Sequence, residues 1–468
     1  MNRRQFFDTS RFCLGPATLA LLNQKYSGAD EKRPAPEFPG PHLPPRIKRV
    51  IFLYMAGGPS QFETFDYKPV LAGMDGQPMP ESYTKGQPIA QLQGQELKCL
   101  GPLTTFRSCG ESGQLISDFL PWHRKMADDL CVIRSMVTEQ INHDPAHTFM
   151  NTGTGLSGRP SMGSWITYGL GSEAQNLPGF VVMTSVGGRN PQPISSRQWS
   201  AGFLPGKFQG VEFNSTGSPV HYLDSPPGVT RAGQRQLINT IQELNRHRLA
   251  DSINPELETR IAAYETAFQM QVAVPELVDM SNEPKHILDM YGAVPGDGSF
   301  ASNCLLARRM AERGVRFIQL YHRGWDHHGG LVGFMTTCSK LTDQPAWALV
   351  QDLKQRGMLD ETLILWGGEF GRTPMFQGKG GAGRDHHIKA FTMWAAGGGI
   401  RAGMSYGATD ELGYHAVEDV VHVRDLHATM LRLLGLDHQQ LSVRFQGLDM
   451  RLTGVEPARV ITEILQQG

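Results

Sequence analysis

Residues 49–55 read RVIFLYM and are followed at once by the glycine-rich turn AGGPS at 56–60. An unbroken apolar run of this length is typical of a strand that is covered on both faces of a sheet. We expect further strands of the same kind at 130–135, 180–183, 315–321, 362–366 and 391–396. Together these runs predict a central sheet that is buried on both sides.

Helices are expected between the strands. Apolar side chains recur at helical spacing in 231–272, and shorter helices are predicted at 302–313, 343–357 and 425–434. Because strands and helices alternate in the second half of the chain, we predict an α/β fold with a largely parallel, doubly wound sheet.

The chain has 468 residues, which is more than one hydrophobic core usually serves. It therefore holds either two domains or one large domain with insertions, which we predict at 70–115 and 185–300. Lys and Arg number 44 against 45 Asp and Glu, so there is no electrostatic reason to expect nucleic acid or an anionic membrane surface as a partner. No later segment has the ~18 consecutive apolar residues of a membrane span, and we predict none in the mature protein.

The first residues are typical of an export signal. Arg3 and Arg4 precede an apolar run at 12–22 that is too short for a permanent membrane helix, and twin arginines before such a run resemble a Tat signal. We predict a signal peptide at 1–30, a proline-rich linker at 31–47, and a periplasmic or secreted protein exported by the Tat machinery. The alternative is a basic N-terminus on a buried helix.

Six cysteines are scattered along the chain, and none forms a CxxC pair. This spacing gives no support for a zinc ribbon or a thioredoxin-like motif. Cys99 and Cys109 fit a disulfide in an oxidising compartment about as well as they fit two free thiols.

Four polar clusters lie beside predicted strands. They are GGPS (57–60) with Glu63 and Asp66 close behind it, WDHHG (325–329), GEFGRTP (368–374) and GRDHH (383–387). In a doubly wound sheet, ligands bind beyond the carboxyl ends of the strands. The last cluster precedes its strand, so its loop is expected to fold back across the sheet to join the others.

Carboxylates and imidazoles from separate segments are what a divalent metal site requires. We predict that Asp326, His328, Glu369 and His386 bind one or two such ions. Taken singly, an Asp-His-His triplet also fits a hydrogen-bonded surface loop, and Glu369 also fits an ion pair with a neighbour such as Arg372. The combination of clusters around one sheet favours the metal site.

Five further side chains are candidates for catalysis. Ser60 lies at a glycine-rich strand end and fits either a covalent nucleophile or a helix-capping turn. His143 and His147 fit acid–base groups or further ligands. Arg372 and Arg384 fit clamps for a phosphate or sulfate group, because a guanidinium matches two of its oxygens. Exposed salt bridges are the alternative for both arginines.

Seven stretches of the chain resemble the DUF1501 family, which is grouped with the alkaline phosphatase/sulfatase superfamily. They are AGGPSQFETFDYKP (56–69), NTGTGLSGRPSMGSWITYGLG (151–171), GWDHHG (324–329), WGGEFGRTP (366–374), GRDHHIKAFTMWAAGGGIRAG (383–403), YGATDELGY (406–414) and RDLHATMLRLLGLDH (424–438). The resemblance implies that residues 48–468 form a three-layer alkaline phosphatase/sulfatase-like fold with a largely parallel sheet and long loop insertions.

The resemblance also assigns ligand positions. The segment 359–371 resembles the sulfatase strand that ends in Ser-Asp-His-Gly. By this match Glu369 takes the position of the metal-binding Asp, while Phe370 takes that of the His. Asp326 and His328 resemble the Asp and His that hold the other metal ion.

At three other functional positions the chain either departs from the superfamily pattern or offers two candidate residues. His386 or His387 supplies the last imidazole. The first strand ends in glycine where a metal-binding Asp is expected, so only Glu63 or Asp66 remains as a substitute. His143 falls at the nucleophile position, and no Cys-x-Pro-x-Arg motif exists for the usual sulfatase route.

The implied function is that of an exported hydrolase that depends on a divalent ion, which is Zn, Ca or Mg. Its substrate would be a sulfate or phosphate ester, either a small anionic ester or a sulfated or phosphorylated glycan. The departures from the superfamily pattern favour the alternative, which is a non-catalytic exported binding or scaffold protein on the same fold. Whether the protein is an enzyme stays open at this point.

Overall fold

The computed structural model describes residues 38–467 apart from 189–191, 221–227, 252–254 and 379–380, and the side chains of 246–262 are also not described. The predicted signal peptide at 1–30 lies outside the described residues. Residues Pro39–Gly468 form one compact unit. Across the described part of the chain, no helix is long and apolar enough to cross a membrane.

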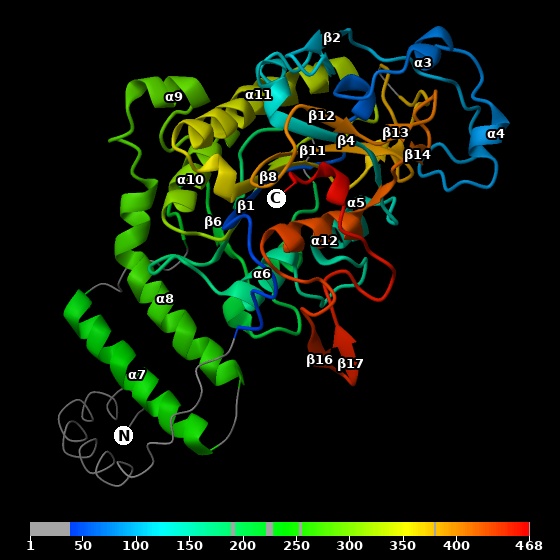
Figure 1. The fold of residues 1–468 in the computed structure, drawn as a ribbon. Coiled ribbons are helices and arrows are strands. Elements are labelled where there is room, and N and C mark those ends of the chain that lie inside the picture. The colour runs from blue at the N-terminus through cyan, green and yellow to red at the C-terminus, as the bar shows by residue number, and fades with distance from the viewer. Residues whose placement is uncertain (1–37, 189–191, 221–227, 252–254, 379–380, 468) are drawn as a thin grey trace, which may run out of the picture. The chain divides into compact units, whose positions relative to one another are not determined.

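The fold is built on a nine-stranded sheet (Figure 1). In spatial order its strands are β12 (Met404–Tyr406), β4 (Leu130–Val137), β11 (Phe391–Gly397), β8 (Thr362–Gly367), β1 (Arg49–Ala56), β7 (Phe317–Arg323), β5 (Phe180–Thr184) and β6 (Val211–Phe213), and β15 (Val421–His422) also pairs with β4. All run in one direction except β11, which is antiparallel to both of its neighbours, β4 and β8. The predicted α/β fold with a largely parallel sheet is confirmed.

The reversed direction of β11 corrects one expectation. The loop 383–387 was expected to fold back across the sheet because it precedes its strand. Since β11 is antiparallel to β8, its amino end lies at the edge where the parallel strands have their carboxyl ends. The loop therefore reaches that edge directly.

Helices cover both faces of the sheet and form a three-layer arrangement. One face carries α5 (His143–Thr152), α6 (Met162–Leu170) and α12 (Val423–Leu433), while the other carries α8 (Pro255–Val278), α9 (Lys285–Tyr291), α10 (Phe300–Glu312) and α11 (Leu331–Gln355) (Figure 1). The strand β1 shows how both faces are filled, because Ile51 and Leu53 enter one core while Val50 and Phe52 enter the other. The unbroken run of apolar residues from Val50 to Ala56 in β1 is thus explained by burial on both sides.

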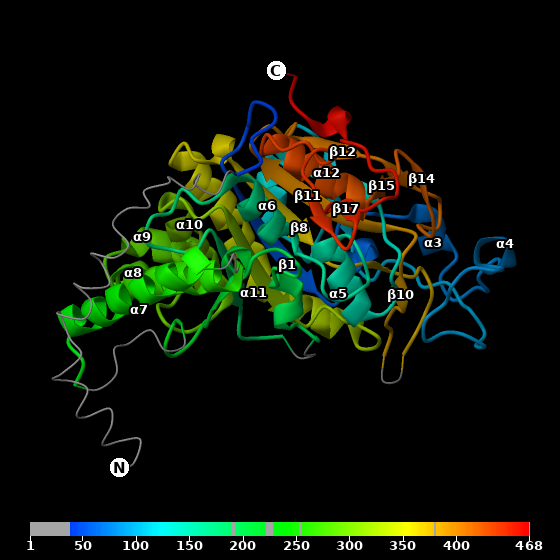
Figure 2. The ribbon, with the colours of Figure 1, turned by 90° about the horizontal axis from the view of Figure 1, so that it is seen from below.

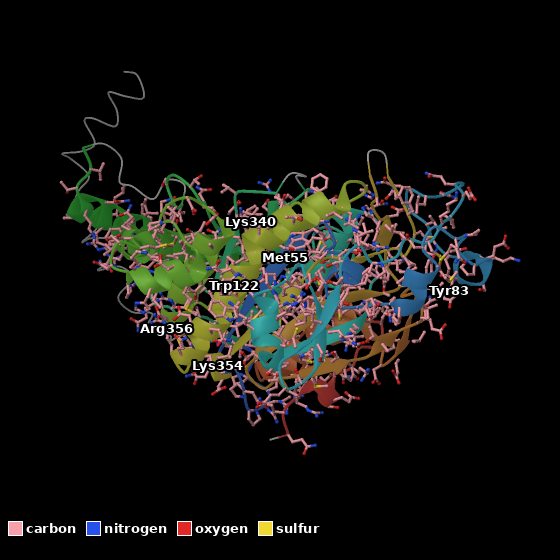
Figure 3. All side chains as sticks on the ribbon, turned by 90° about the horizontal axis from the view of Figure 1, so that it is seen from above. Met55, Tyr83, Trp122, Lys340, Lys354 and Arg356 are labelled. Carbon is pink, nitrogen blue, oxygen red and sulfur yellow. The ribbon has the colours of Figure 1, made fainter. Side chains whose placement is uncertain are left out.

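The helix α11 begins at Leu331 rather than at the predicted residue 343. Its first half contains Gly333 and several threonines, which have weak helix propensity, but Met335 and Cys338 are buried in the core. Packing against the sheet therefore outweighs local preference. At the other end Lys354 and the adjoining Arg356 lie on the surface (Figure 3) and pair with Asp129 and Glu312.

The predicted insertions contain regular structure of their own. Residues 185–300 include α7 (Arg231–Asp251), which lies beside α8 in an antiparallel pair (Figure 2). Residues 70–115 include α4 (Glu81–Thr84) and β2 (Phe106–Cys109), with α3 (Pro69–Gly73) at their start, and a small separate core. The remaining short strands pair as β2 with β3 (Gln114–Ser117), β13 (Ala408–Thr409) with β14 (Ala416–Glu418), and β16 (Val443–Phe445) with β17 (Leu448–Met450). Cys99 and Cys109 are both buried free thiols.

A buried histidine in α12 predicts acid sensitivity of the fold. His427 is 1% exposed, and burial lowers its pKa from 6.5 to about 4. Between these two pH values the unfolded chain binds a proton at this site that the folded chain does not. Stability should therefore fall as pH falls through this window, with a slope of up to about 1.4 kcal/mol per pH unit from this residue.

Urea unfolding of the wild type and of His427→Gln between pH 7 and pH 4 measures this contribution. The variant should lose stability less steeply than the wild type over that range, because glutamine does not titrate. Parallel curves would show that His427 is not held neutral in the folded protein.

Candidate metal centre

The site lies at the edge of the sheet where β1, β4, β7 and β8 end and β11 begins. The turn after β7 carries Asp326 and His328, and Glu369 follows β8 directly. His143 opens α5 after β4. The short strand β10 (His386–His387) pairs with β9 (Gly371–Arg372), which holds His386 beside the end of β8. Segments far apart in the sequence therefore meet at one edge.

Three imidazoles converge on one carboxylate. Asp326 Oδ1 lies 2.8 Å from Nε2 of His328 and 3.2 Å from Nε2 of His386. Asp326 Oδ2 lies 3.2 Å from Nε2 of His143. The Nε2 atoms of His328 and His386 are 2.9 Å apart. Ligand atoms bound at about 2.0–2.1 Å to one ion are about 2.9–3.4 Å apart, so this spacing fits a single metal ion.

The opposite nitrogen of each imidazole faces a hydrogen-bond acceptor. The Nδ1 atom of His143 lies 2.7 Å from Glu369 Oε1. That of His328 lies 2.6 Å from Gln377 Oε1. That of His386 lies 2.8 Å from the Ile141 carbonyl oxygen. An acceptor at this position favours the tautomer with a proton on Nδ1. Each Nε2 then presents its lone pair to the centre, which is the arrangement that orients histidine ligands in metal sites.

Glu369 lies behind His143 and not among the three converging Nε2 atoms. Its carboxylate is fully buried and accepts hydrogen bonds from the Gly57 N–H at 3.0 and 3.2 Å. With His143 and His147 it forms a second group of potential metal ligands. The sequence predicts Glu369 as a ligand beside Asp326, whereas the structure places it as the partner of His143.

The electrostatics of the cluster are balanced by ion pairing. Burial raises the pKa of the Asp326 carboxyl, but the Arg372 guanidinium and the neighbouring imidazoles outweigh burial and hold it well below its usual range. Burial lowers the pKa of His143, but hydrogen bonds to Asp326 and Glu369 outweigh burial and raise it. Burial lowers the pKa of His386 to about 4. The carboxyl groups of Asp326 and Glu369 are therefore both ionised, as metal ligands and their partners must be.

Arg372 joins the loops around the centre. Its side chain is fully buried and donates to Asp326 Oδ1 at 2.6 Å, to the Gly58 carbonyl oxygen at 2.9 Å and to the Arg384 carbonyl oxygen at 3.1 Å. It also donates to the Gly57 carbonyl oxygen. Its donors are therefore engaged by the protein itself, and it positions Asp326.

Glycine at position 57 has a steric reason. A Cβ atom there would lie 2.4 Å from the backbone nitrogen of Asp326, and the φ angle of Gly57 is +121°. The first strand therefore ends in close backbone contact with the turn that carries Asp326. A metal-binding Asp at this point would collide with that turn.

Three predicted residues form a separate buried network. Arg384 and Glu63 make a two-pronged ion pair, with N–O distances of 3.0 and 2.8 Å, and both side chains are fully buried. The Ser60 hydroxyl donates to Glu63. Arg384 also donates to the carbonyl oxygens of Leu100 and Gly101. The structure thus places Ser60, Glu63 and Arg384 outside the cluster around Asp326.

Two further predicted ligands point elsewhere. Asp66 pairs with Lys68 at 3.1 Å and accepts a hydrogen bond from the Thr409 hydroxyl at 2.5 Å. His387 Nε2 lies 2.5 Å from the Tyr414 carbonyl oxygen. Successive side chains of a strand point to opposite sides, so His386 enters the cluster and His387 does not.

His147 lies one helical turn after His143, as the spacing of four residues requires. Its Nδ1 is 2.9 Å from the Tyr54 hydroxyl and 3.5 Å from Glu369. No sequence pattern points to Ile141 or Gln377, because one contributes a backbone carbonyl and the other a lone amide in a loop.

Glu369→Gln is expected to lower metal affinity by about 10- to 100-fold, because loss of the charged acceptor weakens the orientation of His143. The measurement is competition of the purified variant with a chelator for zinc. Glu361→Gln is the matched control, since Glu361 is 44% exposed and pairs with Lys48. Unchanged affinity in Glu369→Gln would show that this carboxylate does not support the centre.

The family described as "Protein of unknown function (DUF1501)" matches residues 47–465. No curated protein matches the sequence. Among the solved structures that match are a sulfatase and a protein in the alkaline phosphatase superfamily. The matches also include the lipoteichoic acid synthase LtaP from Listeria monocytogenes, at 10% identity and a TM-score of 0.36, which covers 93% of this chain and 80% of that one.

The protein in the alkaline phosphatase superfamily is from Vibrio parahaemolyticus, and the sulfatase is PsFucS1 from Pseudoalteromonas sp. The first has 12% identity and a TM-score of 0.31, and covers 90% of this chain and 74% of that one. The second has 13% identity and a TM-score of 0.33, and covers 84% and 68%. At TM-scores below 0.5 these structures carry no detail over to the centre, whose chemistry depends on its own side chains.

Proposed function

The chain belongs to the DUF1501 family, and we propose that it is an exported metal-dependent hydrolase of phosphate or sulfate esters. The observation that carries the proposal is the convergence of three imidazole Nε2 atoms on the Asp326 carboxylate. Calcium and magnesium prefer oxygen ligands, whereas imidazole suits zinc and its neighbours. Of the ions predicted from the sequence, zinc fits this donor set best.

The residues that would hold the ion are Asp326, His143, His328 and His386. A bound divalent ion supplies Lewis acidity toward an ester oxygen and toward water. Glu369 fixes the orientation of His143, and Arg372 fixes that of Asp326. Of the four residues, His328 has the most exposed side chain, at 22%, so substrate would approach from its side.

We propose water as the nucleophile. Ser60 is 1% exposed and its hydroxyl donates to Glu63, so it is not free to attack an ester. His143, which falls at the nucleophile position of the superfamily, faces Asp326 and Glu369 with its two nitrogens. This arrangement supports direct hydrolysis without a covalent enzyme intermediate.

A non-catalytic exported binding protein is the second candidate. Phe370 occupies the position at which the superfamily has a histidine ligand. Its ring centroid lies 4.5 Å from that of His386 and 5.0 Å from that of His143. A buried apolar ring on this side of the centre leaves less room for a second ion, and this favours binding without turnover.

Export is proposed from the sequence alone. Arg3 and Arg4 before the apolar run 12–22 support a Tat signal, and residues 1–30 lie outside the described part of the structure. Fusion of this segment to a reporter that matures only after Tat export tests it. A twin-lysine version of the segment should abolish export of the reporter.

The test of the hydrolase proposal is metal analysis of the purified mature protein followed by a screen of phosphate and sulfate esters. We expect about one zinc-like ion per chain and turnover that a chelator abolishes. His386→Ala should lose both the ion and the turnover. Metal-loaded protein that hydrolyses none of these esters would favour the binding protein, and protein without a bound ion under replete conditions would contradict the hydrolase and leave only the non-catalytic alternative.

A further inference from the structure

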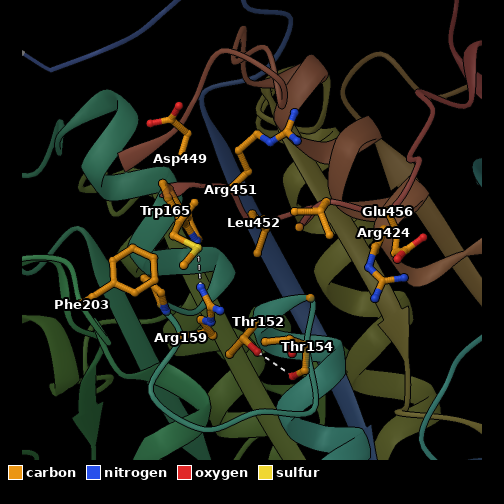
Figure 4. Close-up of a pocket in the computed structure, with 15 residues that line it drawn as sticks. Thr152, Thr154, Arg159, Trp165, Phe203, Arg424, Asp449, Arg451, Leu452 and Glu456 are labelled. Atoms are coloured by element: carbon orange, nitrogen blue, oxygen red, sulfur yellow. Dashed lines mark hydrogen bonds between the residues drawn. The ribbon is translucent and has the colours of Figure 1, made fainter. Parts of the chain in front are cut away.

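A second pocket lies at the far end of α5 from the metal centre (Figure 4). It has a volume of about 240 Å³. His143 opens α5 and Thr152 closes it, and a rise of 1.5 Å per residue places the two ends about 14 Å apart. The pocket is therefore separate from the centre, and the inference below does not depend on the proposed hydrolase.

Three arginines line this pocket, and two of them have no carboxylate partner among the described residues. Arg159 is half-buried, and its Nη1 lies 2.7 Å from the thioether sulfur of Met450, which is a weak acceptor. Arg451 is also half-buried and makes no ion pair within the described part of the chain. A half-buried guanidinium without a carboxylate partner can take up an anionic one, so the pocket has capacity for an added anion.

The third arginine, Arg424, is only partly satisfied. It pairs with Glu139 and stacks on Phe149, yet its Nε is buried and has no hydrogen-bond partner among the described residues. Arg159 and Arg424 approach the pocket from opposite sides (Figure 4). The acidic lining residues offset little of this charge, because Asp449 already pairs with Arg444 and only the exposed Glu456 remains.

Apart from Thr152 and Thr154, the rest of the lining is largely apolar. Trp165 and Leu452 are buried, and the Phe203 ring lies under the Arg159 guanidinium at 5.8 Å. An aromatic wall beside guanidinium groups suits a ligand with a flat or ring-shaped body and an anionic head. The small volume excludes most drug-sized molecules, whose sites measure about 300–1,000 Å³.

We propose that this pocket binds a small oxyanion carried on a ring, with a phosphate, sulfate or carboxylate head held by Arg159 and Arg451. The head accepts hydrogen bonds from the guanidinium groups, and the ring packs against Phe203 and Leu452. No covalent step is involved.

The test is isothermal titration of the full mature chain with phenylphosphonate, benzenesulfonate and benzoate, none of which an ester hydrolase can cleave. Inorganic phosphate and sulfate are the ring-free comparisons. We expect at least one ring-bearing probe to bind several-fold more tightly than its ring-free counterpart. Equal affinities would overturn the aromatic part of the proposal, and no binding of any probe would overturn all of it.

Variants locate the binding. Arg451→Met and Arg159→Met should each weaken binding by at least tenfold, whereas Arg107→Met, an exposed arginine on β2, should leave it unchanged. Phe203→Ala should remove only the preference for a ring. Asp326→Asn should bind the probes as the wild type does, and loss of binding in Asp326→Asn alone would move the site to the metal centre and overturn the proposal.

Discussion

Asp326→Asn is expected to lower zinc affinity by at least about 100-fold and to leave the purified protein essentially free of bound metal. Within the described part of the chain, Asp326 is the one carboxylate on which the three Nε2 atoms converge, with separations of 2.8–3.2 Å. Removal of its charge leaves neutral ligands to balance a divalent cation. Loss of a residue that only hydrogen-bonds to a metal ligand already lowers metal affinity by about 10- to 100-fold. Loss of a ligand itself should lower the affinity at least as much.

His387→Gln is the matched control for this variant. His387 is adjacent to His386 and equally buried, but its Nε2 lies against the Tyr414 carbonyl oxygen. Its metal content should equal that of the wild type. Circular dichroism and thermal melting check that Asp326→Asn remains folded, since Arg372 loses an acceptor. Equal metal content in the wild type and in a folded Asp326→Asn protein would refute the assignment.

Arg384→Met is expected to destabilise the protein by about 3–5 kcal/mol. The Glu63 carboxylate is fully buried. In the variant it would keep its hydrogen bonds from the Ser60 hydroxyl and the Leu103 N–H. It would lose its two-pronged ion pair with the guanidinium group. An uncompensated buried charge is one of the most costly single changes in a fold. Chemical denaturation with urea measures the difference in unfolding free energy.

Two controls separate charge burial from other effects. Arg444→Met breaks an ion pair with Asp449 in which both side chains are about two-thirds exposed, and it should change stability by less than about 1 kcal/mol. The double variant Arg384→Met, Glu63→Leu removes both buried charges and should recover much of the loss. A single Arg384→Met variant as stable as Arg444→Met would contradict the expected cost.

Strands β1, β4, β5, β7, β8 and β11 were predictable because each is an apolar run that is buried on both faces. The direction of β11 was not, since a buried strand has the same composition whichever way it runs. The helix α11 was predicted only in its second half. Its first half forms because residues such as Met335 pack into the core, and a sequence window cannot register that contact.

The centre was partly predictable for the same reasons. Asp326 and His328 follow a strand closely, so their place at the sheet edge was predictable from the sequence. The choice between His386 and His387 depends on which side of a two-residue strand faces inward, and the sequence carries no sign of this. For His143 the sequence leaves open an acid–base group or a further ligand, because its place beside Asp326 depends on how α5 packs. From the sequence, Arg384 is a candidate anion clamp and Glu63 a candidate metal ligand. Their ion pair is apparent only in the folded structure.

The sequence positions of the donors bear on how the ion is acquired. His143, the Asp326–His328 pair and His386 lie on three distant segments, so no short peptide of this chain can chelate an ion as a zinc finger does. Long-range strand pairing, with its slow loop closure, must come first. The polypeptide should therefore reach its native topology without metal, and the ion should load last, into a preassembled site.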